Sequence, residues 1–154
     1  MDGVDYSSPM PYMWADTLQL AEHAHLLRVL VWAAASVLAG TALLAWMRAG
    51  ERGSALLRHF AIQAVAWGSV DAVLAAGLLT RLAPRDVASA TRLDRFLWLN
   101  IGLDGGYVLV GVTLAVIGWR MGRRLGLIGA GMGVIVQGGA LVLLDLVLAT
   151  RISR

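Results

Sequence analysis

Residues 125–150, LGLIGAGMGVIVQGGALVLLDLVLAT, decide the fold, because this stretch is long and apolar and carries a single ionisable side chain, Asp145. A helix needs roughly 20 mostly apolar residues to cross a lipid bilayer. Three further apolar stretches of this length lie upstream, at about 26–47, 55–79 and 96–119. The sequence therefore predicts an all-α integral membrane protein with four transmembrane helices.

The composition agrees with that prediction. The chain of 154 residues is 58% hydrophobic and 15% charged, whereas soluble domains average about 45–50% apolar and about 25% charged residues. Short connections between the spans favour antiparallel neighbours. We therefore expect an antiparallel four-helix bundle that forms one membrane domain over residues 1–154. Residues 1–16 are expected to be an irregular interfacial segment, with Asp16 as the N-cap of a helix that begins at Thr17.

The charges indicate a lipid bilayer as the environment and no nucleic-acid partner. The formal net charge is +3, and all thirteen basic residues are arginines that gather near the predicted span ends, where they anchor helices to headgroups. Arg48, Arg52 and Arg58 follow the first span, so the positive-inside rule places both termini outside the cytoplasm of a bacterial-type inner membrane. Cysteine is absent, which excludes disulfides and thiolate metal sites.

A weak internal repeat relates the two halves of the chain. Gln63 is followed after seven residues by Asp71, and Gln137 is followed after seven residues by Asp145. This spacing suggests a duplicated helical hairpin, whose copies would be related by an axis along the membrane normal. The alternative is chance matching among the Leu, Val and Ala residues that lipid-facing helices share.

Three carboxylates, those of Asp71, Asp104 and Asp145, lie inside predicted spans, where a charged group costs about 2.5–3.5 kcal/mol on insertion scales. With a rise of about 1.5 Å per residue, all three fall in the same half of the membrane. Helical spacing places further polar and aromatic residues on the same faces. The predicted ligand- or ion-binding residues are Asp71, Asp104, Asp145, Asn100, Gln63, Gln137, Trp67, Tyr107 and Arg28.

Carboxylates placed this close can share protons, hold a cation or pair with Arg28. The first span offers His25, Arg28, Trp32 and Ser36 on one face at the same end. His23, His25 and His59 are not spaced as a pair of metal ligands, so no metal site is predicted and no cofactor is identified.

Two functions remain open, and an enzyme is the less expected outcome because no catalytic motif is present. One is a membrane protein whose carboxylate-lined pocket binds or passes a cation, a proton or a small amine. The alternative is a non-catalytic accessory or scaffolding subunit of a larger respiratory, photosynthetic or secretory membrane complex. In that case the polar residues serve as hydrogen-bonding glue between helices.

Glycine pairs at a spacing of four give a second signal, because they let helix backbones approach closely. The pairs predicted to pack helices are Gly102 with Gly106, Gly122 with Gly126, and Gly129 with Gly133. They serve either the interior of this bundle or contacts with another copy or a partner membrane subunit.

Overall fold

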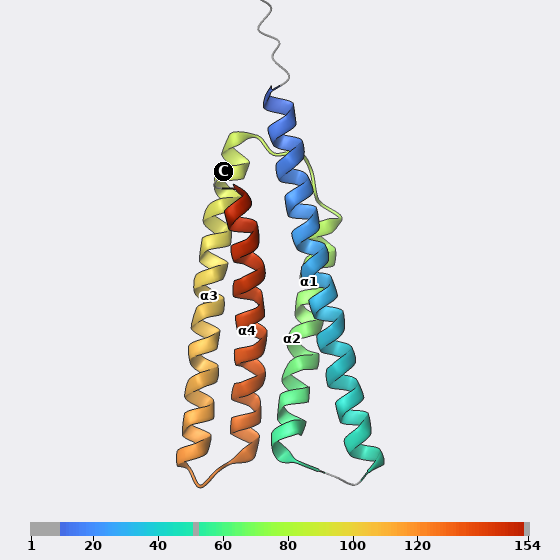
Figure 1. Ribbon diagram of the computed structural model, residues 1–154, viewed down its shortest axis with the longest axis vertical. Helices are drawn as coiled ribbons and strands as arrows, with labels where there is room; N and C mark the ends of the chain where they lie inside the picture. Colours follow the sequence, from blue (N-terminus) through green and yellow to red (C-terminus); the bar gives the residue numbers. More distant parts are fainter. Residues whose placement is uncertain (1–9, 51–52, 153–154) are drawn as a thin grey trace, which may run out of the picture.

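A computed structural model describes residues 10–50 and 53–152, and the regular secondary structure of that part is helical (Figure 1). Its helices are α1 (Met10–Ala49), α2 (Ala55–Leu79), α3 (Val87–Arg120) and α4 (Leu125–Ile152). All four are long and apolar enough to cross a membrane. The prediction of four long apolar helices in an all-helical chain is confirmed.

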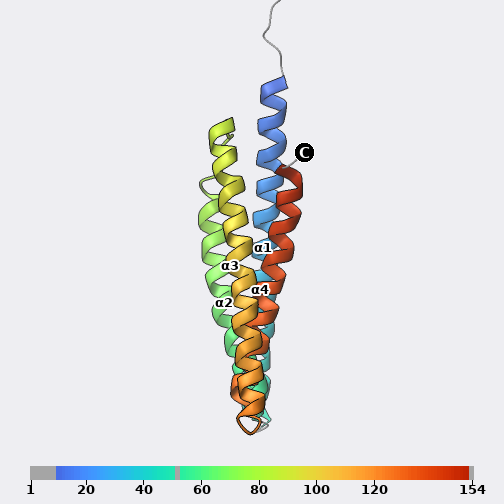
Figure 2. The ribbon, with the colours of Figure 1, turned by 90° about the vertical axis from the view of Figure 1, so that its left-hand side faces the viewer.

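The hairpin α1–α2 lies beside the hairpin α3–α4, with α2 next to α4 (Figure 1). α1 and α3 run downward in that view, and α2 and α4 run upward. α4 packs against each of the other three helices, whereas the backbone of α3 comes close only to that of α4 in the described part of the chain. Among the described residues, no Cα atom of α3 lies within 8 Å of α1 or α2. The α2–α4 contact therefore forms the centre, and the N-terminal end of α1 extends beyond the other helices (Figure 2).

The start of α1 differs from the prediction. The helix begins at Met10, so Asp16 lies inside it and is not its N-cap, and residues 10–16 are not irregular. Pro11 stands in the first turn, where its missing N–H is not needed for an intrahelical bond and its fixed φ suits a helix. The remainder of the predicted irregular segment, residues 1–9, lies outside the described residues.

The start of α3 also precedes the predicted span, because Asp86 caps the helix immediately before Val87. Its carboxylate accepts a hydrogen bond of 2.8 Å from the backbone N–H of Ser89, the usual N-cap arrangement. The hydrogen bonds from Ser89 hold the pKa of Asp86 below its usual value. Next to it, hydrogen bonding to Glu22 raises the pKa of Arg85, whose Nε lies 2.8 Å from a Glu22 oxygen.

Glycine lets α4 approach the helices on both of its sides. A Cβ atom on Gly131 would overlap the carbonyl oxygen of Gly111, which seats α4 against α3. A Cβ on Gly129 would overlap the carbonyl of Leu56, and one on Gly133 would lie 2.6 Å from Cβ of Gln63, both on α2. Gly129 and Gly133 therefore pack inside the bundle.

The other predicted glycine pairs have different places. Gly122 has a φ of +74° and lies in the turn between α3 and α4, so the expectation that it packs helices is not met. A Cβ on Gly126 would lie 3.1 Å from the ring of His59. Gly102 and Gly106 face open space, since a Cβ there would meet no described atom within 4 Å.

Candidate functional site

Each of the four helices contributes one titratable side chain to an interhelical cluster: His25 from α1, Asp71 from α2, Asp104 from α3 and Asp145 from α4. The Nε2 atom of His25 lies 3.3 Å from Oδ1 of Asp145, and both side chains are 9% exposed. Asp145 interacts electrostatically with Asp71 and with Asp104, which also interact with each other. The three predicted carboxylates are thus brought together, with Asp145 as the member that contacts a cationic partner when His25 is protonated.

Two buried atoms of this cluster have no hydrogen-bond partner among the described residues: Oδ2 of Asp71 and Nδ1 of His25. Leaving a buried polar group without a partner costs about 1–3 kcal/mol. A water molecule beside either atom would supply a partner, and a proton on Oδ2 would remove the charge and make this oxygen a donor to a neighbouring carboxylate. The two atoms belong to α1 and α2, which both pack against α4, the helix that carries Asp145.

A small cavity adjoins the cluster between α2, α3 and α4. Asp104, Gln137 and the rings of Trp67 and Tyr107 are among the residues that line it, and its volume is about 10 Å³. The two ring centroids lie 5.1 Å apart at an angle of 58°. A single water molecule needs roughly 10–15 Å³. The cavity therefore accommodates at most one water, and neither a hydrated cation nor an organic amine fits it as it stands.

Gln137 is engaged with α1. Its Oε1 accepts a hydrogen bond of 2.8 Å from the indole N–H of Trp32, and its Nε2 donates one of 3.0 Å to the hydroxyl of Ser36. Gln137 is 4% exposed, so these bonds satisfy a side chain that would otherwise be costly to bury. Its repeat counterpart Gln63 is half-buried, and its Cβ faces Gly133 on α4.

The structure does not bring every predicted member into the cluster. Asn100 is half-buried on α3, and neither it nor Gln63 makes a side-chain hydrogen bond with a described residue. Arg28 is exposed in a groove between α1 and α4, and it forms no ion pair with a carboxylate of the described chain.

His25 is not among the predicted site residues, but it is His25, and not Arg28, that pairs with one of the three carboxylates, Asp145. The sequence feature that pointed to His25 is its helical spacing, because Trp32 and Ser36 follow it after seven and eleven residues and so lie on the same face of α1. Within residues 10–50 and 53–152, no group of three or more His, Cys, Asp or Glu side chains is arranged to hold a metal ion.

Together, the fold and the cluster define a class: an all-helical protein with four candidate membrane spans and titratable groups between them. Within that class, the chain belongs to the family described as "Family of unknown function (DUF6992)", which it matches over residues 28–146. The matched segment contains all three clustered carboxylates. A search of curated proteins and a search of solved structures found no match to this chain.

Proposed function

We propose that this protein is an antiparallel bundle of four transmembrane helices whose interhelical cluster binds and releases a proton within the membrane. On the arginine distribution, it lies in an inner membrane with both termini outside the cytoplasm. Of the three ligand classes that the sequence leaves open, a proton is the one that the surroundings of the cluster favour.

Insertion in a bilayer is supported by the outer surface of the helices. Leu38, Val73 and Leu109 are about 70% exposed, and they belong to three different helices. Apolar patches larger than a few hundred Å² are rare on soluble monomers. In lipid the same surface is solvated by acyl chains, and the polar side chains turn toward the interior instead.

The observation that carries the proton assignment is the buried Oδ2 of Asp71 without a partner, on a residue that interacts electrostatically with Asp145. Two neighbouring carboxylates in a medium of low dielectric do not both ionise freely. A proton on Asp71 removes the repulsion and turns the unpartnered oxygen into a donor that a neighbouring carboxylate oxygen can accept. Unlike a cation or an amine, a proton needs no cavity of its own. His25 supplies a second titratable group next to Asp145.

The test compares Asp71→Asn with Asp16→Asn, a matched change at an exposed carboxylate of α1. Thermal unfolding is measured in detergent at neutral and at mildly acidic pH. We expect Asp71→Asn to raise the free energy of unfolding by about 1 kcal/mol at neutral pH, because the amide removes a buried charge. The gain should shrink on acidification, when the wild-type cluster takes up its proton.

Infrared spectroscopy distinguishes a proton site from hydrogen-bonding glue. Acidification should produce a carboxylic-acid C=O band in the wild type and in Asp16→Asn, and Asp71→Asn should weaken that band. The proposal is wrong if Asp71→Asn leaves the band unchanged and lowers the melting temperature equally at both pH values.

The second candidate, an accessory subunit of a larger membrane complex, is favoured by the open space beside Gly102 and Gly106 on α3. Small residues on an outer face permit the close approach of another helix. Gentle extraction from the native membrane, followed by size-exclusion chromatography and mass spectrometry, tests it. Co-elution with a fixed set of membrane subunits would support this role, and elution as a monomer or homodimer would not.

A further inference from the structure

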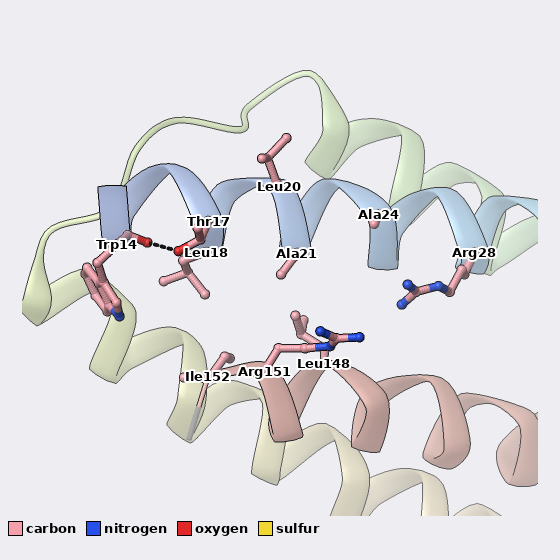
Figure 3. A pocket seen from close by; sticks show the side chains of 10 residues that line it. All are labelled: Trp14, Thr17, Leu18, Leu20, Ala21, Ala24, Arg28, Leu148, Arg151 and Ile152. Carbon is pink, nitrogen blue, oxygen red and sulfur yellow. Dashed lines mark hydrogen bonds between the residues drawn. The ribbon is translucent and has the colours of Figure 1, made fainter. Parts of the chain in front are cut away.

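A groove lies between the N-terminal half of α1 and the C-terminal end of α4, and it has a volume of about 530 Å³ (Figure 3). Leu18, Ala21 and Leu148 form part of its apolar floor, and Trp14 and Arg28 lie toward its two ends. Sites that bind small molecules commonly have volumes of about 300–1,000 Å³. The groove is thus large enough for the headgroup of an amphiphile.

Two arginines extend into this groove from opposite walls. In Figure 3 the guanidinium groups of Arg28 on α1 and Arg151 on α4 both lie in the space between the helices and extend toward one another. Neither forms an ion pair with a carboxylate of the described residues. Two like charges that share a groove repel each other unless an anion lies between them, and paired guanidinium groups suit the oxygens of a phosphate.

The groove continues along the same seam as an apolar furrow. Below Arg28, a second cavity of about 350 Å³ is lined by Val31, Trp32 and Ala35 of α1 and by Ala140, Leu143 and Leu144 of α4. Arg28 belongs to the lining of both cavities. The furrow lies within the predicted spans of both helices, and alanine at positions 35 and 140 keeps it open. A charged end and an apolar extension therefore follow each other along one seam.

We propose that this seam binds one anionic phospholipid, with the phosphate between Arg28 and Arg151 and an acyl chain in the furrow between α1 and α4. This inference rests on the proposed insertion in a membrane and is independent of the proton site. A phosphate alone would use the upper groove only. The continuous apolar furrow and the position of both arginines at the end of the spans identify a lipid as the occupant.

Arginines at span ends also attract anionic headgroups without forming a defined site. In a defined site, lipid binding depends on two particular arginines. In a general belt of arginines around the span ends, it depends only on how many arginines there are. Arg81, exposed just after α2, is a suitable control because it lines neither cavity. Replacing it removes the same charge from the protein and leaves the groove intact.

The experiment uses the full chain purified in a mild detergent, titrated with phosphatidylglycerol or phosphatidylcholine and analysed by native mass spectrometry. We expect the wild type to retain phosphatidylglycerol in preference to phosphatidylcholine, with one lipid bound most tightly. Arg28→Gln or Arg151→Gln should weaken that binding about fivefold each, the effect expected of one arginine near an anionic lipid. Arg81→Gln should bind as the wild type does.

The furrow is tested by Ala35→Phe, which fills it without changing the charge. We expect this variant to lose affinity for long-chain phosphatidylglycerol while its affinity for a short-chain analogue is unchanged. Equal losses in Arg28→Gln and Arg81→Gln would overturn the inference in favour of a general basic belt. Competition by inorganic phosphate at the concentration of the lipid would overturn it in favour of a free-anion site. Asp71→Asn should bind the lipid normally, so failure here is distinguishable from failure of the proton site.

Discussion

The two outer helices meet the central pair α2–α4 in different ways. α1 lies close to α4, and there the indole of Trp32 and the hydroxyl of Ser36 bind Gln137, while His25 contacts Asp145. α3 faces α2 across the other seam, where no described Cα atoms come within 8 Å. Asp71 of α2 lies between Gly68 and Ala75, which both pack against α1, and its Oδ2 has no hydrogen-bond partner among the described residues.

The difference follows from what each outer helix offers. Counted back from Trp46 and Trp119, the α3 positions that correspond to His25, Trp32 and Ser36 hold Trp98, Gly105 and Leu109. None of these supplies a side-chain partner of the kind found on α1. Gln137 and Asp145 of α4 therefore both have side-chain partners. Of the corresponding residues of α2, Gln63 makes no side-chain hydrogen bond and Oδ2 of Asp71 has no partner among the described residues. The α1–α4 seam uses its polar groups as glue, whereas Asp71 of α2 keeps a buried oxygen without a partner among the described residues.

The largest effect is expected where α3 is attached, because α4 is the helix whose backbone α3 approaches closely. Gly131→Leu should lower the free energy of unfolding by about 3 kcal/mol or more, since its side chain would collide with the backbone of Gly111 and overpacking against backbone is poorly relieved. Thermal unfolding in detergent measures this. Gly102→Leu on α3, which faces open space, should change stability by less than about 0.5 kcal/mol. Similar losses in both variants would contradict the assigned packing.

This arrangement was only partly predictable from the sequence. Hydropathy alone gives the four helices, because each apolar run exceeds the length of a span. The early start of α1 was missed because residues 10–16 look irregular in composition, yet Pro11 is harmless in a first turn. Gly122 was assigned to packing because a spacing of four does not reveal that the helix has already ended at Arg120.

An intermediate effect is expected from the two glutamines, which occupy corresponding places in the repeat. Gln137→Leu should lower the free energy of unfolding by about 2 kcal/mol, because the part-buried N–H of Trp32 loses its acceptor and the buried amide that bonds Ser36 is removed. Gln63→Leu should change it by no more than about 0.5 kcal/mol. Equal losses, measured by thermal unfolding of both variants, would mean that the two seams are equivalent and that the contrast between them is not real.

The site was predictable to the same partial degree. Counting residues along antiparallel helices places Asp71, Asp104 and Asp145 at similar depth, and the structure does bring them together. The partner of Asp145 was not predictable, because His25 and Arg28 lie on adjacent parts of one helix face. Which of them meets Asp145 depends on the rotation of α1, and that rotation is fixed by burial of Leu26 and Val29 against Ala75 and its neighbours. Tertiary packing of this kind is not encoded in the spacing of polar residues.

The smallest effect is expected at the connection that leads into the α2–α3 seam, where Asp86 caps α3. Its pKa is lowered in the folded protein by the hydrogen bonds from Ser89. Because the pKa of Asp86 is lower in the folded protein, the cap stabilises α3 at pH values above 3.8, the pKa of the unfolded chain. This stabilisation is lost as the pH falls through the lower pKa of the folded protein.

Asp86→Ala should therefore speed hydrogen exchange at the amide of Ser89 near neutral pH, and the difference from the wild type should vanish in strong acid. Asp86→Asn, which keeps an N-cap acceptor without a titrating group, should retain protection at both pH values. Faster exchange confined to the first turn would show that the cap orders only the entrance of α3, whereas a change that reached Asp104 would mean that the connection also sets the spacing of the open seam.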